Sequence, residues 1–497
     1  MVKSIKSNIV SVYFSSLIPS VLTYAFWVMA SNFTNSEAIG IMAAILSFSM
    51  ILSTLSNFEI SLGMKRFLTK SIEDNNLQHF KNIVSIASVF LLATSIIIII
   101  IAANPIFDFF ELGGIEKKFI PLVVIIVISS GLQHIFRQTL VSKLESQKIL
   151  FPVIVASVVR FPLFFALFAL FDESILNVTV SFSFFYVVVV SILFYKIIKD
   201  LTKIKGPFFH NSRQNLNILI RGSVARWFPQ IISVLGTQSG LLVILTSHGA
   251  SEAGLYYIPL AIYNTLFLVS AAVTQITHTI FSRNDDHETQ LLFLRKSLKL
   301  TFFGTLPLAA ILIFYAGEFL STFGKAFEIS GDTLSILILS FPFAIIGESA
   351  FFLFFGQGKY KKILFLGLAG NVPRIVLYYF LIPQYGIEGA AIAFVVGTFC
   401  QFILSVIYLE REKYRIQYVT FTILSIVPIG IGFVLHQIEI GIIGSVMILI
   451  ISFIIFLKLK IINEEDTLEI LKILTDDKKA INFNKKLFLN LKKLHIF

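Results

Sequence analysis

The sequence predicts an all-α, polytopic membrane protein with about 14 transmembrane helices, arranged as two parallel six-helix lobes around a central cavity plus two extra C-terminal helices. Only 14% of its residues are charged and 56% are hydrophobic, whereas soluble domains carry roughly 25% charged residues. Apolar stretches of about 20 residues, enough to span the hydrocarbon core of a bilayer, follow one another along the chain. Basic residues are concentrated in alternate loops between them.

The first seven apolar stretches of spanning length lie at 9–31, 37–62, 83–103, 118–142, 147–171, 175–198 and 217–246. Seven more lie at 253–282, 296–316, 331–356, 361–383, 387–409, 417–436 and 439–460. We interpret the first stretch as a retained helix, because a cleaved signal peptide has a shorter apolar core and a small-residue cleavage site.

The positive-inside rule tests this arrangement independently. With both termini cytoplasmic, the outer loops contain only three of the 40 basic residues: Lys117, Lys118 and Lys325. Five arginines fall inside spans, and all the others lie on the inner side. A missed span would invert every later loop, so the alternation supports fourteen spans. The net charge of +11 is therefore attributed to cytoplasmic loops, and no nucleic acid is expected as a partner.

The sequence contains few signs of a cofactor-binding or metal-binding site. The single cysteine, Cys400, lies in an apolar stretch, which excludes an intramolecular disulfide and any CxxC-type metal site. A phosphate-binding GxxxxGK[ST] loop is absent, so ATP hydrolysis by this chain is not expected. HExxH and similar metal-binding motifs are absent too. We therefore predict neither a cofactor nor a metal, and a protein that is not an enzyme.

An internal repeat relates the two halves of the chain. Residues 148–151 (KILF) recur as 362–365, a shift of 214, and the same shift brings Arg160 onto Arg374. It also brings Gly40 onto Gly254, and Ser36-Glu37-Ala38 recurs one residue out of step at 251–253. A chance match in a chain rich in Phe, Ile and Leu is the competing explanation. A repeat of six helices enters the membrane from the same side each time, so the copies should be parallel, with a cleft between them.

The repeat divides the chain into four parts. Residues 1–215 form an N-terminal six-helix lobe, 216–415 a C-terminal six-helix lobe, and 416–460 two additional transmembrane helices. Residues 461–497 form a basic amphipathic tail, interpreted either as lying on the anionic inner leaflet or as disordered.

Two arginines near the centre of spans are the main candidates for function. Arg160 and Arg374 each lie beside a proline, Pro162 and Pro373, which kinks a helix. A central arginine costs roughly 3 kcal/mol to insert and usually faces a cavity or a partner. Because guanidinium binds phosphate in a bidentate manner, two arginines facing the cleft predict a site for phosphate or pyrophosphate. The alternative is a structural arginine bonded to backbone carbonyls at the kink.

Further polar residues lie on the faces of other spans. Arg226 is the third predicted phosphate ligand, in a polar stripe with Gln230 that must face protein or water. The residues predicted to line the cavity are Asn371, Gln230, Arg137, Asn264 and Gln275. Two interpretations of the stripe remain, cavity lining and contact between helices. Arg137 is also close enough to the inner end of its span to reach the lipid phosphates.

Two glutamates inside spans are candidates for proton or sodium coupling, Glu59 and Glu348. Acidic residues at such depth are uncommon and usually functional. A simple ion pair between Glu59 and Lys65 or Arg66 is the alternative for the first of them.

Residues 381–393 (LIPQYGIEGAAIA) resemble the segment joining the eleventh and twelfth helices of polysaccharide-biosynthesis flippases. These belong to the multidrug/oligosaccharidyl-lipid/polysaccharide exporter superfamily, which also contains the multidrug and toxin extrusion exporters. Residues 254–261 (GLYYIPLA) and 356–360 (GQGKY) are similar to its other recurrent segments. The resemblance implies a V-shaped pair of lobes, alternating access, and a cationic cavity that receives a lipid pyrophosphate sugar.

The leading hypothesis is a flippase that moves a polyprenyl-(pyro)phosphate-linked oligosaccharide across the cytoplasmic membrane. Its partners would be the lipid-linked substrate, membrane lipids, and a glycan polymerase or glycosyltransferases. A cation-coupled multidrug exporter of the same superfamily is the second hypothesis, although five arginines inside spans against two glutamates favour an anionic substrate. A polytopic polymerase or ligase is the third, disfavoured because the predicted outer loops are short.

Overall fold

The computed structural model describes residues 2–104, 113–171, 173–281, 286–459 and 461. For residues 2–17, 62, 66, 225, 268–281 and 442 it describes the backbone alone. The predicted basic tail, 461–497, lies outside the described residues except for its first position.

Helices make up nearly all of the described chain. The first half contains α1 (Val2–Phe33), α2 (Ser36–Asn57), α3 (Ile60–Glu73), α4 (Leu77–Ala102), the 3-10 turn η1 (Lys117–Phe119), α6 (Ile120–Ser142), α7 (Gln147–Leu170) and α8 (Ser174–Thr202). The second half contains α9 (Ser212–His248), α10 (Ala250–Phe281), α11 (His287–Phe314), α12 (Ala316–Ser321), α13 (Lys325–Glu328), α14 (Gly331–Leu339), α15 (Phe341–Gly356) and α16 (Tyr360–Arg411). The chain continues through α17 (Tyr418–Gln437) and α18 (Gly441–Lys458).

Within the described residues, nine helices are long and apolar enough to cross a membrane, and the bent pair α14–α15 makes a tenth. The 52-residue α16 holds two of the predicted spans, joined at Gly386, whose φ of 54° and ψ of −133° are not helical. With α1, α10 and α18, helix covers most of the described residues in every predicted apolar stretch. The prediction of an all-α polytopic membrane protein is confirmed.

The second predicted span, 37–62, is shorter than expected. The helix α2 ends at Asn57, and the chain bends at Phe58 and Glu59, which both have left-handed backbone angles with φ of 49° and 52°. The helix α3 then begins at Ile60. Left-handed geometry costs a residue with a Cβ roughly 1–2 kcal/mol, so neighbouring contacts must hold this bend in place.

The tenth predicted span, 331–356, consists of two helices bent by 44° at Ser340. Pro342 lies in the first turn of α15, where the missing N–H of proline costs no hydrogen bond. Proline cannot continue the preceding helix without losing one, so the break falls at this point.

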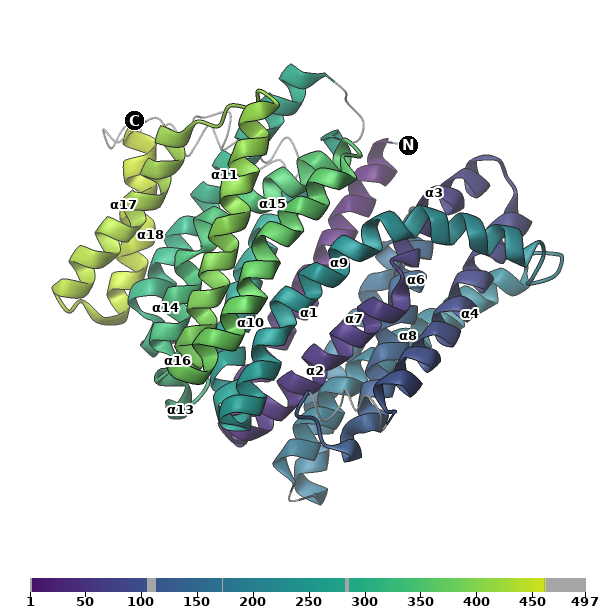
Figure 1. The fold of residues 1–497 in the computed structure, drawn as a ribbon, viewed down its shortest axis with the longest axis horizontal. Helices are drawn as coiled ribbons and strands as arrows, with labels where there is room; N and C mark the ends of the chain where they lie inside the picture. Colours follow the sequence, from purple (N-terminus) through teal and green to yellow (C-terminus); the bar gives the residue numbers. More distant parts are fainter. Residues whose placement is uncertain (1, 105–112, 172, 282–285, 460, 462–497) are drawn as a thin grey trace.

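The helices form two groups joined by α9, which runs diagonally between them (Figure 1). The helix α2 packs on α4, α6 and α8 in its own half and on α9 and α10 in the other, while α9 packs along α16. One hydrophobic core extends through both halves, a second lies among α3, α4, α6, α7, α8 and the start of α9, and a third joins α11 to α17 and α18. The division at residue 216 falls inside α9, which contacts both groups.

Candidate functional site

A polar cavity of about 420 Å³ lies among four helices of the second half, α9, α10, α15 and α16. Its wall combines two arginines, one glutamate and several amides with a set of aromatic rings. The lining residues are Arg226, Pro229, Gln230, Ser233, Thr237, Tyr263, Asn264, Phe267, Ala344, Glu348, Phe351, Phe352, Phe355, Tyr360, Ile363, Gly367, Asn371, Arg374, Phe394, Thr398 and Gln401. The size suits a small polar group or one part of a larger ligand.

Arg374 lies on this wall and is 5% exposed. Its guanidinium donates hydrogen bonds to Asn371 Oδ1 at 3.2 Å and to Thr398 Oγ1 at 2.9 Å, and lies 4.0 Å from the centre of the Phe394 ring. Its Nε has no hydrogen-bond partner among the described residues. Both hydrogen-bond partners of Arg374 are neutral, so the guanidinium forms no hydrogen-bonded ion pair within the described residues and can pair with an anion in the cavity.

The two arms of α16 lie close together because glycines face each other across them. A Cβ on Gly397 would lie 2.4 Å from the carbonyl oxygen of Gly370 and 2.7 Å from the Cβ of Arg374. Any larger residue would separate the arms. This approach brings Thr398, on the second arm, within reach of Arg374 on the first.

Side chains of α16 likewise pack directly against glycines of α9. A Cβ on Gly236 would lie 2.1 Å from Asn371 Oδ1, and one on Gly240 would lie 2.7 Å from the Tyr378 ring. Small residues allow helices to pack closely in lipid, where no hydrophobic effect drives them together. The position of Asn371, and through it of Arg374, is thus fixed by α9.

Arg226, on α9, is the second arginine of the cavity wall. Its guanidinium lies 4.3 Å from the centre of the Phe355 ring, and its Nε is 3.8 Å from a carboxylate oxygen of Glu59. The predicted coupling residue Glu59 therefore lies at the α2–α3 bend, beside Arg226, and is not itself part of the cavity wall.

The second predicted coupling residue, Glu348, lies on the cavity wall on α15, where the charge of Arg374 acts on it. Gln230, Asn264 and Gln401 add uncharged donors and acceptors to the same wall. The cavity thus combines two cations and one carboxylate with amides that suit hydroxyl groups, and with rings that suit the flat faces of sugars.

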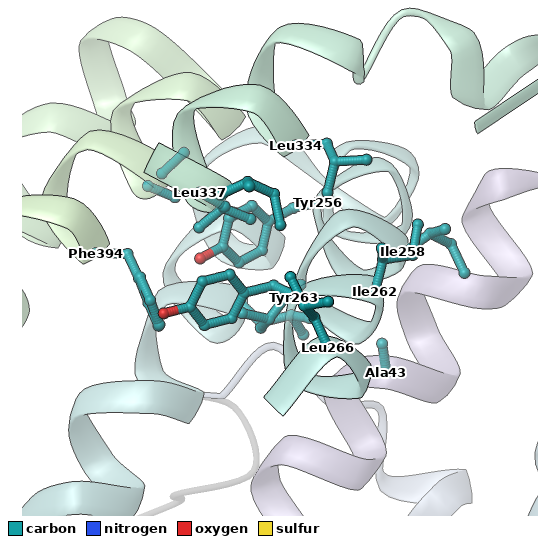
Figure 2. Close-up of a cluster of buried hydrophobic side chains, with 14 of the residues drawn as sticks. Ala43, Tyr256, Ile258, Ile262, Tyr263, Leu266, Leu334, Leu337 and Phe394 are labelled. Atoms are coloured by element: carbon teal, nitrogen blue, oxygen red, sulfur yellow. The ribbon is translucent and has the colours of Figure 1, made fainter. Parts of the chain in front are cut away.

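One tyrosine of α10, Tyr263, lines the cavity, and Tyr256 lies on the same side of this helix. In Figure 2 the hydroxyls of Tyr256 and Tyr263 point to the same side, toward Phe394, whereas Ala43 of α2 lies on the opposite side of α10. Tyr263 lines the cavity, and its hydroxyl accepts a hydrogen bond of 3.1 Å from Ser340, at the break between α14 and α15. The broken span therefore positions a cavity residue.

Arg160 is buried in the first half, 1% exposed, and is not on the wall of this cavity. It donates a hydrogen bond to Thr23 Oγ1 at 3.0 Å and is surrounded by four aromatic rings. The rings lie 4.9–5.8 Å from the guanidinium carbon and belong to Phe26, Phe161, Phe182 and Phe185. Arg160 and Arg374 are therefore both buried, each against at least one aromatic ring, but the structure does not bring the two into one cavity.

The remaining predicted site residues divide between the halves. Arg137 lies on α6 in the first half and is not a residue of the cavity wall. Gln275 lies on α10, and its side chain is outside the described residues. In the described part of the chain no group of three His, Cys, Asp or Glu residues could hold a metal ion.

Several cavity residues were not predicted from the sequence. Thr398 and Gln401 come from the second arm of α16, and both line the wall. They are three residues apart, which places two polar groups on one face of an otherwise apolar span. That spacing was the available signal. The phenylalanines at 351, 352 and 355 gave none, because aromatic residues are common throughout the chain.

Solved structures of transporters have the same arrangement of helices. The chain matches the lipid II flippase MurJ, in an inward closed conformation, with a TM-score of 0.71 and 14% identity over 89% of this chain and 97% of that one. It matches an inward-facing multidrug resistance MATE family transporter of the MOP superfamily with a TM-score of 0.61 and 17% identity over 82% and 98%. The chain has the MATE and MurJ fold.

A third match is a MOP superfamily transporter from Pyrococcus furiosus, with a TM-score of 0.58 and 15% identity over 82% of this chain and 96% of that one. The binding pocket of that transporter has a reverse polarity, which suggests a different function for it. Among curated proteins, a "Putative O-antigen transporter" of Shigella flexneri is 28% identical over 165 residues. This match covers 33% of this chain and 40% of that protein. No family model matches the sequence.

Proposed function

We propose that this protein is a flippase that carries a polyprenyl-(pyro)phosphate-linked oligosaccharide across the cytoplasmic membrane by alternating access. The observation that carries the proposal is the cationic cavity, in which Arg374 and Arg226 face the same space with no carboxylate in hydrogen-bonding contact with Arg374 among the described residues. The shared MurJ fold and the partial similarity to the O-antigen transporter support the same class of cargo.

In this proposal the phosphate binds the two arginines while sugar hydroxyls bond to the amides of Gln230, Asn264 and Asn371. A cavity of about 420 Å³ would hold the phosphate and the first sugars, so the rest of a longer glycan would extend out of it. The polyprenyl chain would remain in the bilayer, and both termini would be cytoplasmic. Arg160 is not on the cavity wall, so its proposed contact with the phosphate requires the halves to rearrange.

Reconstitution tests the proposal directly. Purified protein is placed in vesicles with a fluorescent polyprenyl-pyrophosphate sugar, and a membrane-impermeant quencher reports the fraction of label in the outer leaflet. We expect the wild type to equilibrate the label, the variant Arg374→Ala to lose this activity, and the variant Arg411→Ala to keep it. Arg411 is an exposed residue at the end of the same helix. Equal activity in the two variants would exclude a role for Arg374 in transport.

A cation-coupled exporter is the second candidate, because Glu348 places a carboxylate on the cavity wall and the chain also matches MATE structures. This alternative expects organic cations to be transported and Glu348→Gln to abolish their transport. The flippase expects no transport of organic cations. Adding labelled cationic dyes to the same vesicles distinguishes the two.

A further inference from the structure

The bend between α2 and α3 is held by two consecutive residues of α9. The indole N–H of Trp227 donates a 2.9 Å hydrogen bond to the Thr54 carbonyl, in the last turn of α2, and its ring stacks on Phe58 with centres 4.3 Å apart and planes at 19°. The neighbouring Arg226 lies beside Glu59, the second residue of the bend. One turn of the second half therefore contacts both left-handed residues of the first.

Arg226 belongs to the cavity at the same time. It lines the cavity wall beside Phe355, while Glu59 approaches it from the first half. The 3.8 Å separation of Arg226 Nε from Glu59 is too long for a hydrogen bond, and this Nε has no hydrogen-bond partner among the described residues. The guanidinium thus lies between an anion of the first half and an open cavity in the second.

We propose that Glu59 couples the cavity to the movement of the two halves by competing with the substrate phosphate for Arg226. This rests on the proposed function, because the competing anion is the phosphate of the proposed substrate. A phosphate can accept two parallel hydrogen bonds from a guanidinium. The carboxylate of Glu59, at 3.8 Å from Arg226 Nε, is too far to accept one from that atom. Binding would draw Arg226 into the cavity and weaken the contact between α9 and the α2–α3 bend.

Two features of the bend favour such a response. A ligand shifts a conformational equilibrium only through contacts that differ between the two states, and the Arg226–Glu59 pair is such a contact. The consecutive left-handed residues Phe58 and Glu59 are strained, and such a conformation persists only where surrounding contacts hold it. Strain of this kind is common at switch regions. Once Arg226 leaves, fewer contacts oppose a change at the bend.

Spin-label distances between the halves test the proposal. On a Cys400→Ser background, labels are attached at Lys70→Cys on α3 and Lys361→Cys on α16, both exposed positions. The distance distribution is measured by pulsed electron paramagnetic resonance in detergent, with and without inorganic pyrophosphate. We expect pyrophosphate to shift the distribution of the wild type, and Glu59→Gln to show the shifted distribution without pyrophosphate.

Controls separate coupling from damage to the fold. Glu73→Gln, which changes an exposed glutamate on α3, should behave as the wild type. Trp227→Phe keeps a stacking ring but removes the hydrogen bond to Thr54, so it should shift the distance distribution toward that of Glu59→Gln. If Glu59→Gln does not fold, Trp227→Phe alone tests whether the contact between α9 and the bend controls the distance.

The outcomes also separate this proposal from the proposed function. Titration calorimetry with pyrophosphate is run on the same samples. Failure of the wild type to bind pyrophosphate would count against the anion site itself. Binding without any change in the distance, together with Glu59→Gln and Trp227→Phe distributions equal to that of the wild type, would overturn the coupling and leave the anion site standing.

Discussion

Gly40 on α2 and Gly254 on α10 lie against each other where the two helices cross. A Cβ added to Gly40 would lie 2.7 Å from the backbone nitrogen of Gly254, and one added to Gly254 would lie 3.0 Å from that of Gly40. The hydroxyls of Ser36 and Ser251 are 2.6 Å apart beside this crossing. These are the residues that the internal repeat pairs, and equivalent residues meet in this way at a two-fold axis.

Substitution of either glycine should destabilise the contact between the halves. A Cβ on Gly40 would lie 1.8 Å from the carbonyl oxygen of Ala250, so Gly40→Ala must displace backbone and not merely a side chain. We expect a loss of about 1–3 kcal/mol, seen as a lower melting temperature in detergent. Gly304→Ala on α11 is the matched control, because no described atom lies within 4 Å of its new Cβ. It should be neutral or stabilising.

Gly386 should be required for the bend of α16. Its φ of 54° and ψ of −133° belong to a region that only glycine occupies readily. Among the described residues, no atom lies within 4 Å of an added Cβ. Gly386→Ala should therefore cost about 1–3 kcal/mol through the backbone alone. Gly430→Ala, on α17, also has open space around its Cβ. An equal melting temperature for the two variants would contradict this explanation.

Glu412 should make stability depend on pH. It pairs with Lys359 at 2.6 Å and with Lys362, and hydrogen bonds from these two lysines lower the pKa of its carboxyl. A carboxyl with a lowered folded-state pKa adds stability above its unfolded-state pKa, which is lost as the pH falls through the folded-state value. Because the pair is partly exposed, we expect at most about 1 kcal/mol.

The measurement compares the melting temperatures of the wild type and Glu412→Gln over a range of pH. Glu412→Gln should melt at a lower temperature near neutral pH, and the difference should disappear under acid conditions. Glu410→Gln is not a clean control, because Glu410 accepts a hydrogen bond from Tyr418, so Glu388→Gln on α16 serves instead. A difference that persisted in acid would contradict the assignment.

Arg160 and Arg374 should behave differently although the repeat makes them equivalent. Arg374 is on the cavity wall and Arg160 is not. We expect Arg374→Ala to lose both pyrophosphate binding and transport, and Arg160→Ala to lose transport while still binding pyrophosphate. Calorimetry and the vesicle assay measure the two properties on the same preparations. Loss of binding in both variants would contradict the assignment of pyrophosphate binding to the Arg374 cavity without Arg160.

The sequence determined the class of protein and most of its helices, because each span needs its own run of apolar residues whatever its neighbours are. It also singled out Arg226, Gln230, Asn264, Glu348, Asn371 and Arg374, which the cavity brings together. A polar group inside a bilayer must face protein or water, so such residues are conspicuous in a single sequence. The repeat paired Gly40 with Gly254, but that these two glycines touch was shown only by the structure.

Only the tertiary structure decided which of these groups meet. It placed Glu59 in a bend where a continuous span was predicted, put Thr398 in contact with Arg374 through the fold of α16 at Gly386, and left Arg160 outside the cavity. The pattern of hydrophobic residues along one helix indicates how that helix lies in the membrane and which of its faces is buried. It does not record which other helix covers that face, since this depends on the packing of residues far apart in the chain.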